Sequence, residues 1–287
     1  TIMADMLLNA GATVVPLRPF GHQVNEVVID NDDPQVTFAG SWSNSSSTHF
    51  YGTSGDVPYR YASTVTGSAT ATATYDASSL IPEAGVYPVY VWSRWGFDRI
   101  NQTYIIGFEG GSATRKINHR YVGAGWIYVG SYYFEPGGQA YVEITNVEES
   151  GDPGGVVIAD AVRLGNGMGD VDIDGEVSGH PREEENGRYW LVESRGVGSG
   201  LAATGSVNSP PYLAEHMNYT NAGYDTGNQT DRIYFSFHSN GGGGRGADGL
   251  FNTDSVCSSD PADAGAYSTT NGPELGSHAG TYINSDM

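Results

Sequence analysis

A series of short apolar segments separated by turn-forming residues runs from Val24 to about Gly165 of this 287-residue chain. Gly, Pro, Asn and Asp separate the segments at the spacing that is typical of strands in a β-sandwich. We find no apolar pattern of helical period within this block. The sequence therefore predicts an inserted antiparallel, jelly-roll-like β-sandwich over residues 23–166. The expected strands are 69–75, 85–92, 103–108, 126–134, 140–147 and 156–164.

Several motifs give this block a resemblance to a known domain. They are IDNDD (29–33), GSW (40–42), ATATY (71–75), GVYPVYVW (85–92), GAGW (123–126) and IADAVRL (158–164). Together they resemble the golvesin-like domain, which is also described as a xanthan-lyase-type carbohydrate-binding-like module. The resemblance implies a β-sandwich and a role in binding polysaccharide.

Tryptophan side chains in the block could form a platform for sugars, because aromatic faces pack well against a pyranose ring. We predict Trp42, Trp95 and Trp126 as glycan-binding residues. Trp95 is the best surface candidate, since it follows Arg94 just after an apolar strand. Trp92 lies within that strand and is expected in the core. The alternative, that most of these rings fill the core, stays open at this point.

The segments on either side of the block have a different pattern. Residues 1–10 predict a helix that ends at Asn9-Ala10-Gly11, and residues 12–17 predict a strand. A helical period returns after the block, and 209–223 is expected to form another helix that begins near Pro210. We therefore predict one incomplete α/β domain in two pieces, residues 1–22 and 180–287, that the β-sandwich interrupts.

A second motif lies in the later piece. Residues 233–237 predict a buried strand, which ends in His238, Ser239 and Asn240 before four glycines. Ligands of open α/β sheets bind at the carboxyl ends of strands, where His238 would lie. An ordinary strand-end histidine is the alternative explanation.

The stretch FSFHSN, followed by a small-residue loop and RGADGLFN, resembles the zinc-dependent N-acetylmuramoyl-L-alanine amidases. That resemblance implies that His238 is a zinc ligand and that Asn240 and Arg245 contribute to the substrate loop. The family's other two zinc ligands and its catalytic glutamate have no counterpart in this chain. We therefore assign no catalytic residue, and we expect the chain alone to be an inactive fragment of a peptidoglycan hydrolase.

Between the sandwich and the later piece lies an acidic, glycine-rich segment, residues 167–179. Asp170, Asp172 and Asp174 with Gly175 match the opening of a calcium loop. The twelfth position of that loop is Pro181, followed by Arg182, rather than a bidentate acid. We therefore interpret the segment as a solvated linker and do not expect calcium there.

Charge and composition limit the partners. Thirteen basic residues against 33 acidic ones give a net charge of −20, which repels nucleic acid and anionic lipid. A single cysteine excludes an internal disulfide, and no apolar run is long enough to span a membrane. The expected partner is peptidoglycan or another polysaccharide, and the expected location is extracellular or in the cell envelope. A non-enzymatic polysaccharide-binding protein is the alternative function.

Overall fold

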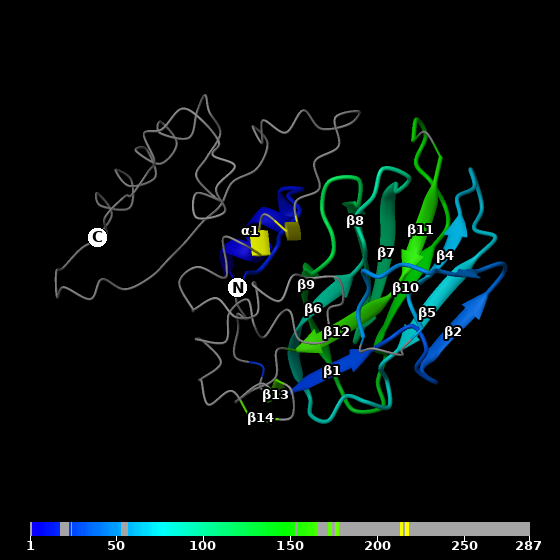
Figure 1. Ribbon diagram of the computed structural model, residues 1–287. Helices are drawn as coiled ribbons and strands as arrows, with labels where there is room; N and C mark the ends of the chain where they lie inside the picture. The colour runs from blue at the N-terminus through cyan, green and yellow to red at the C-terminus, as the bar shows by residue number, and fades with distance from the viewer. Residues whose placement is uncertain are drawn as a thin grey trace, which may run out of the picture. The chain divides into compact units, whose positions relative to one another are not determined.

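The computed structural model describes residues 2–17, 23, 25–52, 57–152, 154–165, 213–214 and 216–217, together with the backbone of 172–173 and 176–177. The described chain is mostly antiparallel β-structure with one short α-helix (Figure 1). Its elements are α1 (Ile2–Asn9), β1 (Glu26–Ile29), β2 (Val36–Ala39), β3 (Ser43–Asn44), β4 (Arg60–Ser63), β5 (Thr72–Asp76), β6 (Gly85–Trp92), β7 (Asn101–Phe108), β8 (Gly111–Asn118), β9 (Trp126–Phe134), β10 (Tyr141–Thr145), β11 (Val156–Ala159), β12 (Ala161–Gly165), β13 (Asp172–Ile173) and β14 (Glu176–Val177).

The strands form two main sheets and two smaller ones. One main sheet has the order β1-β12-β6-β9, and the other has the order β2-β5-β10-β7-β8. A three-stranded sheet, β11-β4-β3, adds to them, and β13 pairs with β14. The predicted β-sandwich over residues 23–166 is confirmed in its coarse form, because one hydrophobic core draws its residues from both main sheets.

Alternating burial explains why the strands take these places. In β5 the side chains of Ala73 and Tyr75 point into the core while their neighbours do not. In contrast, β6 is buried along nearly its whole length because β12 and β9 flank it. Pro88 is tolerated within β6, because the β12 ladder covers only Val89–Trp92 of that strand.

The passage from β11 to β12 departs from the single predicted strand 156–164. The two strands belong to different sheets, since β11 pairs with β4 while β12 pairs with β1 and β6. Asp160 lies between them and is buried. The chain therefore changes sheets at a buried aspartate.

Helix α1 confirms the predicted helix and its glycine end. The Ala12 amide donates to the Leu7 carbonyl, and the Gly11 amide donates to the Leu8 carbonyl, with Gly11 at a φ of 93°. These two bonds form a Schellman motif, which favours glycine at the left-handed position. The following strand prediction, residues 12–17, is wrong, because Val14 forms only an isolated bridge with Tyr128.

The helix packs on the sandwich. It contacts β9, where Asp5 accepts a hydrogen bond from the Tyr128 hydroxyl, and Ala4 and Leu8 pack against the core. The apolar side chains of Ile2 and Met6 on the same helix are exposed. Within the described residues no α/β layer is present, and the strand expected beside this helix, 233–237, lies outside them.

Residues from beyond the sandwich block also reach its core. Leu213 and Met217 are helical in backbone, as the pattern of 209–223 predicts, and both are buried. The Met217 carbonyl accepts a hydrogen bond from the Gly123 amide at 3.0 Å. A Cβ on Gly125 would lie 2.5 Å from the Met217 sulfur, so Gly125 permits this close packing. Both flanking segments thus supply described residues to the sandwich.

Candidate functional site: an aromatic and arginine cleft

A cleft of about 380 Å³ opens where the segment after β6 meets the three-stranded sheet. Connecting segments held by a rigid sheet scaffold are the usual place for binding residues. The cleft is lined by Ser45, Tyr59, Tyr61, Arg94, Trp95, Gly96, Phe97, Asp98, Arg99 and Val156. Three aromatic residue types and two guanidinium groups therefore share one small concave surface.

Arg99 fixes the floor of the cleft from a buried position. Its Nε donates to the Arg94 carbonyl at 3.2 Å, its Nη2 donates to the Tyr59 hydroxyl at 3.2 Å, and its Nη1 pairs with Asp98. The planar guanidinium can bind three acceptors in one fixed geometry. Arg99 therefore holds the segment after β6 against Tyr59, and its own charge is neutralised by Asp98.

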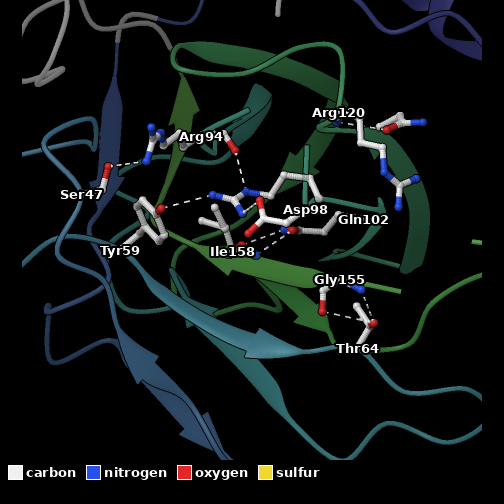
Figure 2. Close-up of polar contacts among 11 residues, drawn as sticks. Ser47, Tyr59, Thr64, Arg94, Asp98, Gln102, Arg120, Gly155 and Ile158 are labelled. Atoms are coloured by element: carbon white, nitrogen blue, oxygen red, sulfur yellow. Dashed lines mark hydrogen bonds and ion pairs between the residues drawn. The ribbon is translucent and has the colours of Figure 1, made fainter. Parts of the chain in front are cut away.

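Arg94 is held more loosely. Its Nη1 donates to the Ser47 hydroxyl at 2.9 Å (Figure 2). Its guanidinium lies 5.8 Å from the centre of the Trp95 ring. No described acidic side chain forms an ion pair with it. Together with burial, its charge lowers the pKa of His49. Arg94 is thus a cation of the cleft wall with hydrogen-bonding capacity for a ligand.

Trp95 is held in place from two sides. Its indole nitrogen donates to the His216 carbonyl at 3.1 Å, and the His49 ring lies 6.0 Å away, centre to centre. The ring is partly buried against the core and also lines the cleft. The prediction of Trp95 as a surface ring of the sandwich agrees with this position. Phe97, 61% exposed, stands beside it on the same cleft.

The other two predicted rings lie elsewhere. Trp42 is partly exposed, and its indole nitrogen donates to the carbonyls of Ala39 and Thr72, which places it at the end of β2 and β5. Trp126 is only 1% exposed and packs against Tyr51, with ring centres 5.1 Å apart. Its role as a sugar platform is corrected here, because neither face of a buried ring is open to a glycan. Trp92 is buried, as expected.

A second group of polar side chains is buried between the sheets. Its residue types are those of many catalytic sites, but it is not open to a substrate. The Tyr104 hydroxyl lies 2.7 Å from Nε2 of His119, and Nδ1 of His119 lies 2.9 Å from the Val122 carbonyl. A carbonyl can only accept, so Nδ1 carries the proton and Nε2 accepts from Tyr104. Burial lowers the pKa of His119 to about 4. Both residues are fully buried, so this pair supports the fold rather than chemistry on a substrate.

The remaining predicted sites lie outside the described residues. This applies to His238, Asn240 and Arg245, and to Asp170 and Asp174. Asp172 is described only in its backbone, as the first residue of β13. Among the described residues, no group of three or more His, Cys, Asp or Glu side chains is placed to hold a metal ion.

Sequence reasoning missed Phe97, Tyr59 and Tyr61 as cleft residues. The stretch SRWGFDR, 93–99, carried a signal, since two aromatic and two arginine residues with a glycine follow directly after a buried strand. Aromatic and arginine residues are enriched at binding surfaces. No comparable signal marked Tyr59 and Tyr61, because they join the cleft only through the pairing of β4 with β11.

Comparisons with known proteins find similarity within this block. Residues 27–166 match the family model described as the Golvesin C-terminal domain. The chain is 30% identical over 152 residues to xanthan lyase of Bacillus sp. (strain GL1), which is 52% of this chain and 16% of that protein. It is also similar to the solved structure of Paenibacillus xanthan lyase, at 28% identity and a TM-score of 0.40, over 48% of this chain and 13% of that one.

The sequence matches support a golvesin or xanthan-lyase-type domain in this chain. The matched segment corresponds to a small part of the curated relative, 16% of its length. The family match ends at residue 166 and does not extend to the motif around His238.

Proposed function

We propose that the sandwich domain binds polysaccharide in the cleft formed by Arg94, Trp95 and Phe97. The observation that carries the proposal is a 61% exposed phenylalanine beside an arginine that has no described acidic partner, both on one concave surface. The resemblance to a xanthan lyase supports a carbohydrate ligand for this domain.

The chemistry of the cleft suits a sugar ring. Phe97 and Trp95 offer apolar faces for the C–H side of a pyranose, and rigid aromatic rings lose little entropy on binding. Arg94 can donate to ring hydroxyls or to a sugar carboxylate. The scaffold beneath is preorganised, because Arg99 and Tyr59 fix the floor through hydrogen bonds that a ligand does not need to form.

Binding of the full chain to a panel of polysaccharides, by affinity electrophoresis and by pull-down on insoluble glycans, tests the proposal. Phe97→Ala should weaken binding roughly tenfold, equivalent to about 1.4 kcal/mol. Arg94→Met should weaken it as well, most strongly for glycans that carry carboxylates. Both side chains line the cleft and neither lies in the core cluster, so both variants should fold.

A matched control is available on β9. Tyr133 is 42% exposed and lies outside the cleft, so Tyr133→Ala removes an exposed ring without touching the proposed site. Its glycan affinity should equal that of the unchanged chain. Trp95→Ala should weaken binding too, but it also removes the bond to His216 and is less clean than Phe97→Ala. Equal affinity of Phe97→Ala, Arg94→Met and the unchanged chain would remove the cleft from the proposal.

A second proposal rests on the sequence motif FSFHSN followed by RGADGLFN. We propose that a protein containing the rest of an amidase domain would use His238 as one zinc ligand and Asn240 and Arg245 in its substrate loop, to hydrolyse the amide of peptidoglycan. His238→Ala in such a protein should lower zinc content, measured by elemental analysis, and the release of stem peptides. Retention of both would leave His238 an ordinary histidine.

Location follows from the proposed ligand. A polysaccharide of the cell wall or the surroundings is met outside the cytoplasm, so we propose an extracellular or cell-envelope location. The structure adds one observation on membranes: none of the described helices is long and apolar enough to cross a bilayer.

A further inference from the structure

The pairing of β1 with β12 brings three oxygen-bearing residues to the region where the chain changes sheets. Asp30 and Asn31 follow directly after β1, and Asp160 directly precedes β12. The two strands are antiparallel, with Ile29 opposite Val162. Two further steps in this register would place Asn31 opposite Asp160. We call Asp30, Asn31 and Asp160 the oxygen cluster.

Two of the three side chains, Asn31 and Asp160, are buried, and each has one acceptor oxygen without a hydrogen-bond partner. Asp160 and Asn31 are each 1% exposed. Oδ1 of Asp160 accepts from the Tyr51 amide at 3.2 Å, whereas its Oδ2 has no hydrogen-bond partner. The Asn31 side-chain nitrogen donates to the Val57 carbonyl at 3.1 Å and to Oδ1 of Asp30 at 3.4 Å, which fixes the orientation of the amide group and leaves its Oδ1 without a partner. Oδ1 of Asp30 also accepts from the Asn31 main-chain amide at 2.6 Å.

The Asp160 carboxylate has no basic partner among the described residues, because no described arginine or lysine forms an ion pair with it. Arg60, which acts on the neighbouring Tyr75, lies over the Phe38 ring at 4.2 Å. Buried carboxylates without a cation or a proton are strongly disfavoured.

We propose that the oxygen cluster is a calcium-binding site. Two carboxylates and an amide oxygen form an all-oxygen donor set, which hard cations prefer, and main-chain carbonyls or water would complete the coordination. Calcium fits better than magnesium, because it accepts irregular oxygen geometry and gives up its water more readily. The proposal uses none of the linker residues Asp170, Asp172 and Asp174, and it does not depend on the proposed glycan cleft.

The position of the site implies a structural role for the bound cation. Tyr51 and Val57 both bond to the cluster through their main chain, and Tyr59 of the cleft follows two residues after Val57. A cation bound to Asp30, Asn31 and Asp160 would therefore join β1, the entry to β12 and the chain that leads into the cleft. Removal of the cation should loosen all three together.

Thermal unfolding of the full chain in chelator and in added Ca²⁺ tests the proposal. At free Ca²⁺ about a hundredfold above Kd, the midpoint should rise by about 5 °C or more. Asp160→Asn keeps the acceptor for the Tyr51 amide but removes the charge, so its Ca²⁺-induced rise should disappear. Its midpoint in chelator should equal or exceed that of the unchanged chain, because a buried charge is gone.

Three further samples make the outcome decisive. Asp30→Asn repeats the test if Asp160→Asn fails to fold. Asp172→Asn removes an acid of the linker and should keep the full Ca²⁺ effect, and Mg²⁺ in place of Ca²⁺ should raise the midpoint less. The proposal is overturned if Ca²⁺ leaves the unchanged chain unaffected, if both Asp160→Asn and Asp30→Asn keep the full rise, or if Asp172→Asn abolishes it.

Discussion

Two polar groups of the sandwich lie at neighbouring points of the passage from β11 to β12 yet differ in how their hydrogen bonds are completed. The histidine network, Gln102, Tyr104 and His119, pairs its donors and acceptors: Gln102 donates to Tyr104, Tyr104 to His119, and His119 to the Val122 carbonyl. The oxygen cluster leaves acceptor oxygens of Asn31 and Asp160 unpaired. Protein groups alone satisfy the hydrogen bonds of the histidine network. The oxygen cluster has the unpaired acceptors of a site that a bound cation would complete.

The two groups act on neighbouring points of the β11–β12 passage. Gln102 binds Ile158 in both directions, accepting from its amide at 2.8 Å and donating to its carbonyl at 2.7 Å. Asp160 follows two residues later and belongs to the oxygen cluster. The entry to the sheet change is therefore fixed by the protein itself, while we infer that its exit depends on a bound ion.

Of the substitutions that test this comparison, Gln102→Leu should lower the unfolding free energy most. The change leaves the Ile158 amide and carbonyl without partners inside the core and removes a donor to Tyr104. Each unpaired buried group costs about 1–3 kcal/mol, so unfolding free energy should fall by about 3–5 kcal/mol. Urea titration measures it, with the exposed Gln139→Leu as control. Added Ca²⁺ should not restore the loss, and full restoration would contradict the separation of the two groups.

The next largest effect is the pH dependence of the histidine network. The folded pKa of His119 is about 4, below the ordinary 6.5, so the unfolded chain binds the proton first as pH falls. Stability is complete above pH 6.5 and is lost between pH 6.5 and 4, by about 3 kcal/mol at 1.36 kcal/mol per pKa unit. His119→Gln should flatten this slope in urea titrations at several pH values. A slope unchanged by the mutation would assign the acid sensitivity to other groups.

The oxygen cluster should show the opposite sign in the absence of metal. The raised pKa of Asp160 means that the folded chain keeps a proton there that the unfolded chain has lost. Its contribution is present below the ordinary carboxyl pKa and is lost as pH rises toward the folded value. Comparing Asp160→Asn with the unchanged chain in chelator measures this, and a variant that is less stable at neutral pH would contradict it.

A smaller loss of stability is expected from Tyr75→Phe. This change affects the main chain where it passes from one sheet to the other, but it alters no side chain of the histidine network or of the oxygen cluster. The Tyr75 hydroxyl donates to the Asp160 carbonyl at 2.8 Å in the buried core. Its removal leaves that carbonyl unpaired and should lower the unfolding free energy by about 1–2 kcal/mol. The Ca²⁺-induced rise in midpoint should persist, because no donor oxygen of the cluster is removed. Loss of that rise would show that the carbonyl orientation is itself part of the site.

The sequence predicted the parts of the fold that have a strong apolar pattern. The bounds of β6 and β9 agree with prediction at both ends, because both are long, apolar and buried. Strand β8 was missed, since it is an edge strand of polar, largely exposed residues that pairs only with β7. The sheet change at Asp160 was missed for another reason: partners far along the chain decide it, and no local pattern records them.

The candidate sites were less predictable than the strands. The sequence predicted Trp95 near the surface because its position directly after a strand is visible locally, whereas the burial of Trp126 depends on its contact with Tyr51 from a distant segment. The oxygen cluster was not predicted, although its residues lie in the quoted motifs IDNDD and IADAVRL. Only the pairing of β1 with β12 brings those two motifs together.

The smallest effect should come from an ion pair that is complete but exposed. Lys116 on β8 pairs with Glu149, and their side chains are 43% and 41% exposed. Hydrogen bonds from Lys116 and Asn101 lower the pKa of Glu149, yet water already solvates both charges. Glu149→Gln should therefore change unfolding free energy by less than about 0.5 kcal/mol, and less still in high salt. Suppose that Glu149→Gln lowered the unfolding free energy as much as Gln102→Leu. Then pairing alone, without burial, would explain why the histidine network is more stable than the oxygen cluster.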